Sequence, residues 1–94
     1  MNPTDPPRQT AVITGATGGI GRELVRQCLL DGMRVVAIGR NTEALGDLSR
    51  FSSAPPPSLI PLNLDLLEPN AARSLLDFLD AHDFPADLLI NCAG

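Results

Sequence analysis

The sequence predicts an α/β fold built on a small parallel sheet, and two observations support this. Short apolar runs rich in β-branched residues alternate along the chain with longer stretches that have helical spacing. These runs are apolar at nearly every position, as expected for strands that are covered on both faces. Strands of this kind, separated by amphipathic helices, are typical of a parallel sheet between two layers of helices.

The first strand is expected at residues 10–14 and the second at residues 34–38. A helix over about 20–31 connects them. Its core-facing apolar stripe is formed by Ile20, Leu24, Val25, Cys28 and Leu29. Gly32 follows this helix as a left-handed C-terminal cap.

A second, weaker helix is expected directly after the second strand. Asn41 or Thr42 can cap its N-terminus, because both side chains can accept a hydrogen bond from a backbone N–H of the first turn. The helix runs to about Phe51, and its spacing turns Leu45 and Leu48 toward the core.

The second half of the chain predicts one more strand–helix–strand unit. Residues 52–57 are rich in proline and serine and form a loop. The third strand spans 59–64, and Pro61 places it at a sheet edge because proline cannot donate to the ladder. A third helix starts near Pro69 and carries a stripe of Ala72, Leu75, Leu76 and Leu79. The fourth strand spans 87–91.

Right-handed crossovers arrange these strands in the order 3-2-1-4, with three helices in two layers around the sheet. The strand order reverses between the first and fourth strands. Ligands bind above such a switch point, outside the carboxyl ends of the strands. A glycine-rich turn after the first strand and the segment 91–94 after the fourth meet there.

The glycine-rich turn is the strongest indication of function. Residues 14–21 read Thr-Gly-Ala-Thr-Gly-Gly-Ile-Gly and join the first strand to the first helix. Glycines let the turn adopt positive φ and let a ligand approach the main chain. The helix N-terminus then offers free N–H groups to an anion, most plausibly a dinucleotide pyrophosphate. Nicotinamide, flavin and S-adenosylmethionine proteins all use such a turn.

The end of the second strand indicates which dinucleotide binds. Arg40 stands there, about 20 residues beyond the turn, where an acidic residue would hold an NAD ribose. A guanidinium matches phosphate geometry, so we expect NADP rather than NAD, with Asn41 and Thr42 as further donors. The alternative is a solvated surface arginine. Asp65, after the third strand, can accept a hydrogen bond from an adenine amine or can cap the following turn.

Composition limits the partners, membrane segments and metal sites that can be expected. The net charge is −4 and no cluster of Lys or Arg occurs, so nucleic acid and anionic membranes are not expected as partners. No apolar run reaches the roughly 20 residues needed to cross a bilayer. The two cysteines predict reduced thiols in a cytoplasmic protein, and no metal site is expected. Residues 1–8 are expected to form a disordered N-terminal arm.

Four separated motifs resemble the short-chain dehydrogenases/reductases. The turn Thr-Gly-Ala-Thr-Gly-Gly-Ile-Gly is similar to the family's TGxxxGxG motif, and Gly39-Arg40 resembles its NADP-type second strand end. Leu64-Asp65-Leu66 is similar to its adenine-contacting segment, and residues 91–94 resemble its NNAG motif. The resemblance implies that residues 9–94 form part of an NAD(P)-binding Rossmann domain.

The resemblance also implies a role for each matching position. The residues expected to bind the cofactor are Thr14, Gly15, Thr17, Gly18, Gly19, Ile20, Gly21, Arg40, Asn41, Asp65, Leu66, Asn91, Ala93 and Gly94. Asn91 would also stabilise the central sheet. Two positions depart from the family pattern: Gly18 stands where some NADP-preferring members have a basic residue, and Cys92 replaces the second Asn of NNAG. Gly15, Gly18 and Gly21 also satisfy the TGxxGxxG spacing of the extended branch, whereas residues 91–94 favour the compact branch.

Family catalysis depends on a Tyr-x-x-x-Lys pair beyond the NNAG motif, and this sequence contains neither Tyr nor Lys. No catalytic residue is therefore expected in it. The resemblance implies the cofactor-binding half of an NADP-dependent oxidoreductase, truncated before its catalytic residues, whose parent transfers hydride between NADP(H) and a carbonyl or alcohol and can be a homo-oligomer. The alternatives are a stand-alone nucleotide-binding or regulatory module, which would leave the fourth strand as an open apolar edge, and an S-adenosylmethionine-dependent methyltransferase, against which Arg40 argues.

Overall fold

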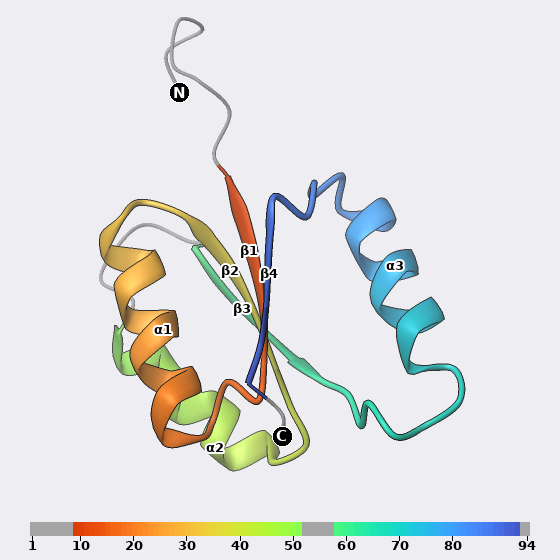
Figure 1. Cartoon of the computed structure of the whole chain (residues 1–94), viewed down its shortest axis with the longest axis horizontal. Coiled ribbons are helices and arrows are strands. Elements are labelled where there is room, and N and C mark those ends of the chain that lie inside the picture. The colour runs from red at the N-terminus through yellow and green to blue at the C-terminus, as the bar shows by residue number, and fades with distance from the viewer. Residues whose placement is uncertain (1–8, 52–57, 93–94) are drawn as a thin grey trace, which may run out of the picture.

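The computed structural model describes residues 9–51 and 58–92. Its elements, in chain order, are β1 (Thr10–Thr14), α1 (Gly19–Leu30), β2 (Arg34–Gly39), α2 (Thr42–Asp47), the 3₁₀ helix η1 (Leu48–Phe51), β3 (Leu59–Asn63), α3 (Ala71–Ala81) and β4 (Leu88–Asn91). Figure 1 shows their arrangement. Every expected strand and helix is present, with bounds within a few residues of those predicted. The arm expected at 1–8 and the loop expected at 52–57 lie outside the described residues.

The strands form one parallel sheet in the predicted order, β3-β2-β1-β4. β1 lies inside the sheet, and each of its residues is buried. β3 is an edge strand, as its proline predicts: Pro61 pairs with Ala37 of β2 and lacks an N–H that a further strand would need. β1 has β2 on one side and β4 on the other, so the switch point lies between the carboxyl ends of β1 and β4.

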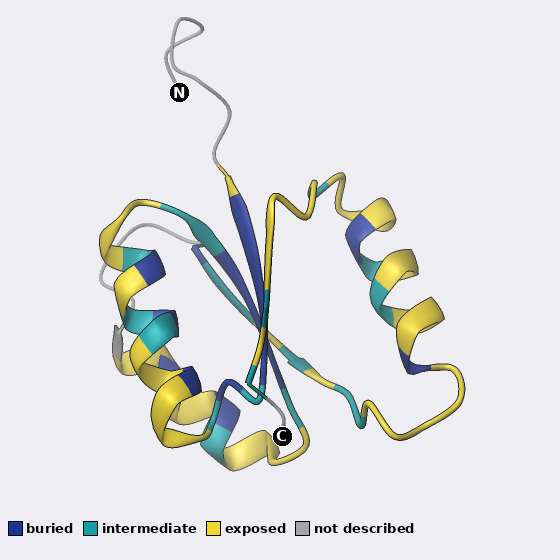
Figure 2. Ribbon diagram, viewed as in Figure 1, coloured by how far each residue is buried: buried dark blue, intermediate teal, exposed yellow. Residues whose placement is uncertain are grey.

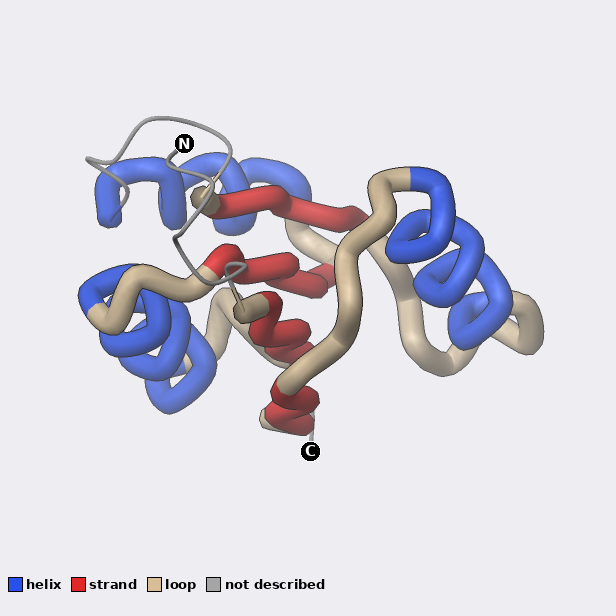
Figure 3. The backbone as a smooth tube through the Cα atoms, turned by 90° about the horizontal axis from the view of Figure 1, so that it is seen from above, coloured by secondary structure: helices blue, strands red, loops and turns tan. Residues whose placement is uncertain are grey.

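Two hydrophobic cores lie on the two faces of the sheet and give the molecule three layers (Figure 3). On one face, α1, α2 and η1 cover the sheet. The buried residues of that core are Ala11, Ile13, Ala16, Val25, Cys28, Val35, Ala37, Leu45 and Leu48. On the other face, Leu79 of α3 and its neighbours pack on the alternate strand positions Val12, Val36 and Ile38. Successive side chains of β1 and β2 therefore alternate between the two cores.

The helix caps follow the local sequence. Gly32 has φ of 82°, the left-handed conformation expected after α1. The Asn41 side chain caps α2 by accepting a hydrogen bond from the Ala44 N–H at 3.0 Å. The helix expected to reach Phe51 instead ends at Asp47 and continues as η1, where the poor helix former Gly46 weakens the last turn. Leu45 and Leu48 are buried as predicted.

The predicted stripe of α1 is wrong at Ile20, which is 75% exposed. The buried positions are Gly21, Val25 and Cys28. The physical reason is the close approach at Gly21: a Cβ atom there would lie 2.0 Å from the Gly15 carbonyl oxygen. The helix face centred on Gly21 therefore meets the sheet, and Ile20, one residue earlier, is turned away.

The predicted stripe of α3 is rotated in a similar way. Leu79 is buried and Leu75 packs against the core as predicted, but Ala72 and Leu76 are exposed and Ala71 is buried. Phe78 accounts for the rotation, since it packs against the sheet core and contacts Phe84 edge to face, with ring centroids 6.4 Å apart, as well as the imidazole of His82 at the helix end. The buried face of α3 therefore includes an aromatic residue that the leucine spacing alone did not indicate.

Candidate functional site: a groove at the carboxyl ends of the strands

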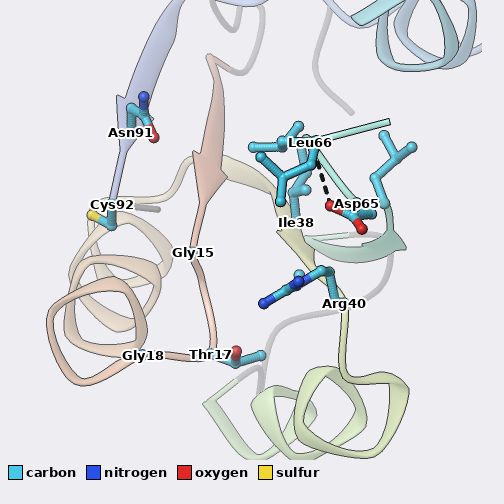
Figure 4. Close-up of a pocket in the computed structure, with 12 residues that line it drawn as sticks. Gly15, Thr17, Gly18, Ile38, Arg40, Asp65, Leu66, Asn91 and Cys92 are labelled. Carbon is cyan, nitrogen blue, oxygen red and sulfur yellow. Dashed lines mark hydrogen bonds between the residues drawn. The ribbon is translucent and has the colours of Figure 1, made fainter. Parts of the chain in front are cut away.

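A groove of about 550 Å³ lies where all four strands end, at the predicted switch point (Figure 4). This volume is within the range of small-molecule and cofactor sites. The groove is lined by Gly15, Thr17, Gly18, Ile38, Gly39, Arg40, Leu64, Asp65, Leu66, Leu67, Asn91 and Cys92. Each strand contributes, because the carboxyl ends of parallel strands meet at one edge of the sheet.

The glycine turn forms one wall of the groove with its backbone. Gly15 has φ of 62°, a left-handed conformation that other residues rarely adopt. Its carbonyl oxygen accepts a hydrogen bond from the Gly18 N–H at 3.2 Å, which closes the turn. Gly21 then packs against Gly15 with no room for a side chain. The turn therefore brings the start of α1 as close to β1 as the backbone allows.

The N-terminus of α1 points unpaired N–H groups out of this turn. Gly18 is the N-cap in an extended conformation and has no side chain to cap the helix. The N–H groups of Gly19, Ile20 and Gly21 have no partner within the helix, because the first residues of a helix lack a preceding turn. Glycine at the cap leaves the space in front of them open to a ligand. With the positive end of the helix dipole, this arrangement suits a phosphate.

Arg40 provides a positive charge on the opposite wall. Its side chain extends from the end of β2 toward the turn that holds Gly15 and Thr17 (Figure 4). Within residues 9–51 and 58–92, it is the one basic residue that lines the groove. No hydrogen bond or ion pair of its guanidinium occurs in that part of the chain, so its five N–H donors are available to a ligand.

The loop after β3 forms an apolar wall with one carboxylate. Asp65 Oδ1 accepts a hydrogen bond from the Leu67 N–H at 2.9 Å, so Asp65 caps the turn as one of the two predicted roles requires. The other carboxylate oxygen leaves capacity for a ligand amine. Leu64 and Leu66 add apolar surface beside Ile38, which suits the faces of a planar base.

The end of β4 closes the groove near the switch point. The Thr14 hydroxyl donates a hydrogen bond to Asn91 Oδ1 at 2.7 Å and so joins β1 to β4 where both strands end. The family resemblance implies a sheet-stabilising role for Asn91, and this hydrogen bond is consistent with it. Cys92 follows in the groove wall, and its N–H donates to the Thr14 carbonyl at 3.1 Å.

The structure brings seven of the predicted cofactor residues together: Gly15, Thr17, Gly18, Arg40, Asp65, Leu66 and Asn91. Five others lie next to the groove without lining it: Thr14, Gly19, Ile20, Gly21 and Asn41. Asn41 is farthest from its expected role, because its side-chain oxygen caps α2. Ala93 and Gly94 lie outside the described residues.

Sequence reasoning missed the apolar lining residues Ile38 and Leu67, and it placed Leu64 and Cys92 in family motifs without predicting that they bind the cofactor. Ile38 reads as an ordinary buried strand residue, and only its place at a strand end, beside Arg40, distinguishes it. Leu67 is 86% exposed and lies in the loop after β3. Because loops often carry binding residues, this position was the available signal that Leu67 lines a site.

No helix in the described part of the chain is long and apolar enough to span a membrane. The same residues contain no cluster of three or more His, Cys, Asp or Glu side chains suited to a metal ion.

Comparison with known proteins identifies relatives of this fold and groove. The family model described as short chain dehydrogenase matches residues 9–94. The NADPH-dependent 1-acyldihydroxyacetone phosphate reductase of Saccharomyces cerevisiae is 36% identical over 91 aligned positions, which cover 94% of this chain and 30% of that protein.

Solved structures agree with this match. A short chain dehydrogenase from Bacillus anthracis superposes with a TM-score of 0.84 at 24% identity, covering 92% of this chain and 34% of that one, which shows the fold. A metagenomic short-chain oxidoreductase in complex with NADP superposes with a TM-score of 0.75 at 34% identity, covering 86% of this chain and 37% of that one.

This chain thus spans about a third of the length of these relatives. The family match covers every strand of the sheet and every residue that lines the groove. On this evidence the chain belongs to the short chain dehydrogenase family.

Proposed function

We propose that this chain is the NADP(H)-binding part of an oxidoreductase that transfers hydride between NADP(H) and a carbonyl or alcohol. The observation that carries the choice of NADP is Arg40, a groove-lining cation just after β2 whose guanidinium has no partner among residues 9–51 and 58–92. No Asp or Glu stands at that strand end to bind a ribose 2′-hydroxyl. The yeast relative is named as NADPH-dependent, and the metagenomic relative was solved with NADP.

In this proposal, different groove residues bind different parts of the cofactor. The N–H groups at the start of α1 hold the pyrophosphate, and Arg40 binds the 2′-phosphate through its guanidinium. Asp65 and Leu66 face the adenine, and Asn91 lies beside the adenosine ribose, with Ala93 and Gly94 expected to follow it. The nicotinamide of the bound cofactor supplies the hydride.

The sequence contains neither Tyr nor Lys. We therefore propose that these 94 residues supply cofactor binding and that proton transfer to the substrate depends on residues outside them. The same absence favours the second candidate, a nucleotide-binding or regulatory module without catalysis. Steady-state oxidation of NADPH in the presence of a panel of aldehydes and ketones distinguishes the two: turnover by a longer gene product favours the oxidoreductase, and tight NADP binding without any turnover favours the module.

The cofactor assignment is tested by replacing Arg40 with alanine. Isothermal titration calorimetry suits this chain, which has no Trp to report binding by fluorescence. We expect Arg40→Ala to weaken NADP binding by about 1.5–3 kcal/mol, the scale of hydrogen bonds to a charged group, and to leave NAD binding nearly unchanged.

The matched control is Arg73→Ala, because Arg73 is an exposed arginine on α3 and does not line the groove. It should bind both cofactors like the unmodified chain. If NADP binds Arg40→Ala as tightly as it binds the unmodified chain, Arg40 is a solvated surface residue and the assignment is wrong.

We also propose a cellular location and an oligomeric state for the protein. We place the protein in the cytoplasm because both of its cysteines are free thiols. Relatives named as chloroplastic, from Brassica napus, make organelle fractionation the direct test of this placement. We also propose that the active oxidoreductase is a homo-oligomer, which light scattering of purified protein measures.

A further inference from the structure

Asn63, the last residue of β3, connects the two loops that form the adenosine end of the groove. Its side-chain amide donates a hydrogen bond to the Arg40 carbonyl oxygen at 3.3 Å, and it also donates to the Thr42 hydroxyl oxygen. The next residue, Leu64, donates its N–H to the Gly39 carbonyl at 3.0 Å. Residues 39, 40 and 42, at and after the end of β2, are therefore each hydrogen-bonded to Asn63 or Leu64.

The chemistry of these contacts fixes the orientation of the amide. A carbonyl oxygen accepts hydrogen bonds and cannot donate them, so the NH₂ group of Asn63 must face Arg40. Its two hydrogens serve the two acceptors, one on Arg40 and one on Thr42. Alanine or leucine at this position would leave both acceptors without this partner.

The same contacts fix the position of the Arg40 backbone, from which its side chain extends. The guanidinium has no partner in the described part of the chain, so nothing at its far end holds it in place. Gly39, directly before it, is the last residue of β2 and pairs with Asn63 in the sheet, so the restraint on this segment comes from β3. The Asn63 bond to the Arg40 carbonyl is therefore a direct restraint on the residue that carries the charge.

We infer that Asn63 is a positioning residue for cofactor selectivity, acting through Arg40 on the 2′-phosphate of NADP. This inference rests on the proposed function, because it assumes that Arg40 meets that phosphate. Asn63 itself does not line the groove and needs no contact with the cofactor. Its effect is to keep Arg40 and Thr42 at a fixed distance from the loop after β3, which faces the adenine.

The test measures binding of two pairs of ligands by calorimetry: NADP with NAD, and adenosine 2′,5′-bisphosphate with 5′-AMP. Each pair differs by the 2′-phosphate alone. We expect Asn63→Ala and the similarly sized Asn63→Leu to weaken binding of the 2′-phosphorylated ligand about 3- to 10-fold, the scale of one or two exposed hydrogen bonds. Binding of NAD and 5′-AMP should stay the same.

A double-mutant cycle with Arg40→Ala shows whether Asn63 acts through Arg40. In the Arg40→Ala background, Asn63→Ala should have no further effect on NADP binding. Asn70→Ala is the control, since Asn70 is an exposed asparagine whose side chain makes no cap hydrogen bond. Thermal unfolding of each variant shows whether it is folded.

Several results would overturn the inference. Equal weakening of NADP and NAD by Asn63→Ala means that the residue supports the fold in general, and no weakening of either means that the bond positions nothing. An additive effect in the Arg40→Ala background means that Asn63 acts by another route. If Arg40→Ala itself leaves NADP binding unchanged, the proposed function fails, and this inference fails with it.

Discussion

The core under α1 and α2 and the β4–α3 side differ in how much apolar surface they bury, although Ile20 and Leu30 of α1 are themselves 75% and 69% exposed. On the α1–α2 side, Ile13, Val25, Val35 and Leu48 are each 0% exposed. On the β4–α3 side, the large apolar residues Leu76, Leu88 and Leu89 are 58%, 42% and 64% exposed. Figure 2 shows the same contrast, with buried positions along β1 and β2 and exposed positions along β4 and much of α3.

The difference shows how the fold supports its groove. The glycine turn requires backbone placement to within a fraction of an ångström, and it lies against the tightly packed core of α1 and β1. The loop after β3 approaches the groove with exposed leucines and one carboxylate, on the less covered side. Within the described residues, β4 pairs with β1 on one side, and Leu88 and Leu89 of β4 are exposed.

The largest effect expected from this contrast is on stability. Ile13→Ala leaves a cavity in the buried core and should lower the free energy of unfolding by about 2–5 kcal/mol. Leu89→Ala on the exposed strand should change it by less than about 0.5 kcal/mol. Urea unfolding followed by circular dichroism measures both. Similar losses for the two variants would mean that β4 is covered in solution.

A smaller effect is expected from the glycines at the start of α1. Gly21→Ala places a Cβ atom 2.0 Å from the Gly15 carbonyl oxygen, and we expect this to lower stability by about 1–3 kcal/mol and to abolish NADP binding by moving the turn. Gly46→Ala is the matched control, because a Cβ there meets no atom within 4 Å and Gly46 lies on α2 without lining the groove. Differential scanning fluorimetry with and without NADP reports both effects. Wild-type NADP binding by Gly21→Ala would show that the close approach is unnecessary.

The smallest effect expected is a difference in thiol reactivity between the two sides. Burial raises the pKa of the Cys28 thiol, with the Asp31 carboxylate adding to the increase, so less of the reactive thiolate forms at pH 8. Cys92 is half-buried in the groove wall. We expect a disulfide reagent to label Cys92 before Cys28, and NADP to slow the labelling of Cys92 alone. Mass spectrometry of labelled peptides assigns the site, and faster labelling of Cys28 would place the more open side at α1.

Local sequence predicted those features whose physical cause is itself local. The proline at position 61 marked an edge strand, Asn41 marked a helix cap, and Gly32 marked a left-handed helix end. The glycine turn and the charge at Arg40 predict a phosphate site at the switch point, and the structure brings both to one groove. The cofactor roles of these residues remain predictions.

Features that depend on how two elements meet were harder to predict. Ile20 and Leu76 fit an apolar stripe by spacing, yet both are exposed because Gly21 and Phe78 set the rotation of their helices. Periodicity shows that a helix has an apolar face, but its orientation depends on which residue makes the closest contact. Nothing in the sequence distinguished Asn63, because the residues that it contacts, Arg40 and Thr42, lie more than 20 positions earlier.

The sequence by itself determined the α/β class and the strand order, because strand runs and helix spacing are encoded by neighbouring residues, and its glycine turn predicted an anion site. Only the tertiary structure decided which side of the molecule is tightly packed, which leucines face the groove, and that the end of β3 holds Arg40 in position. These depend on contacts between residues far apart in the chain, where small differences in approach decide which surfaces are buried. The spacing of residues along the chain does not show how closely two elements approach each other.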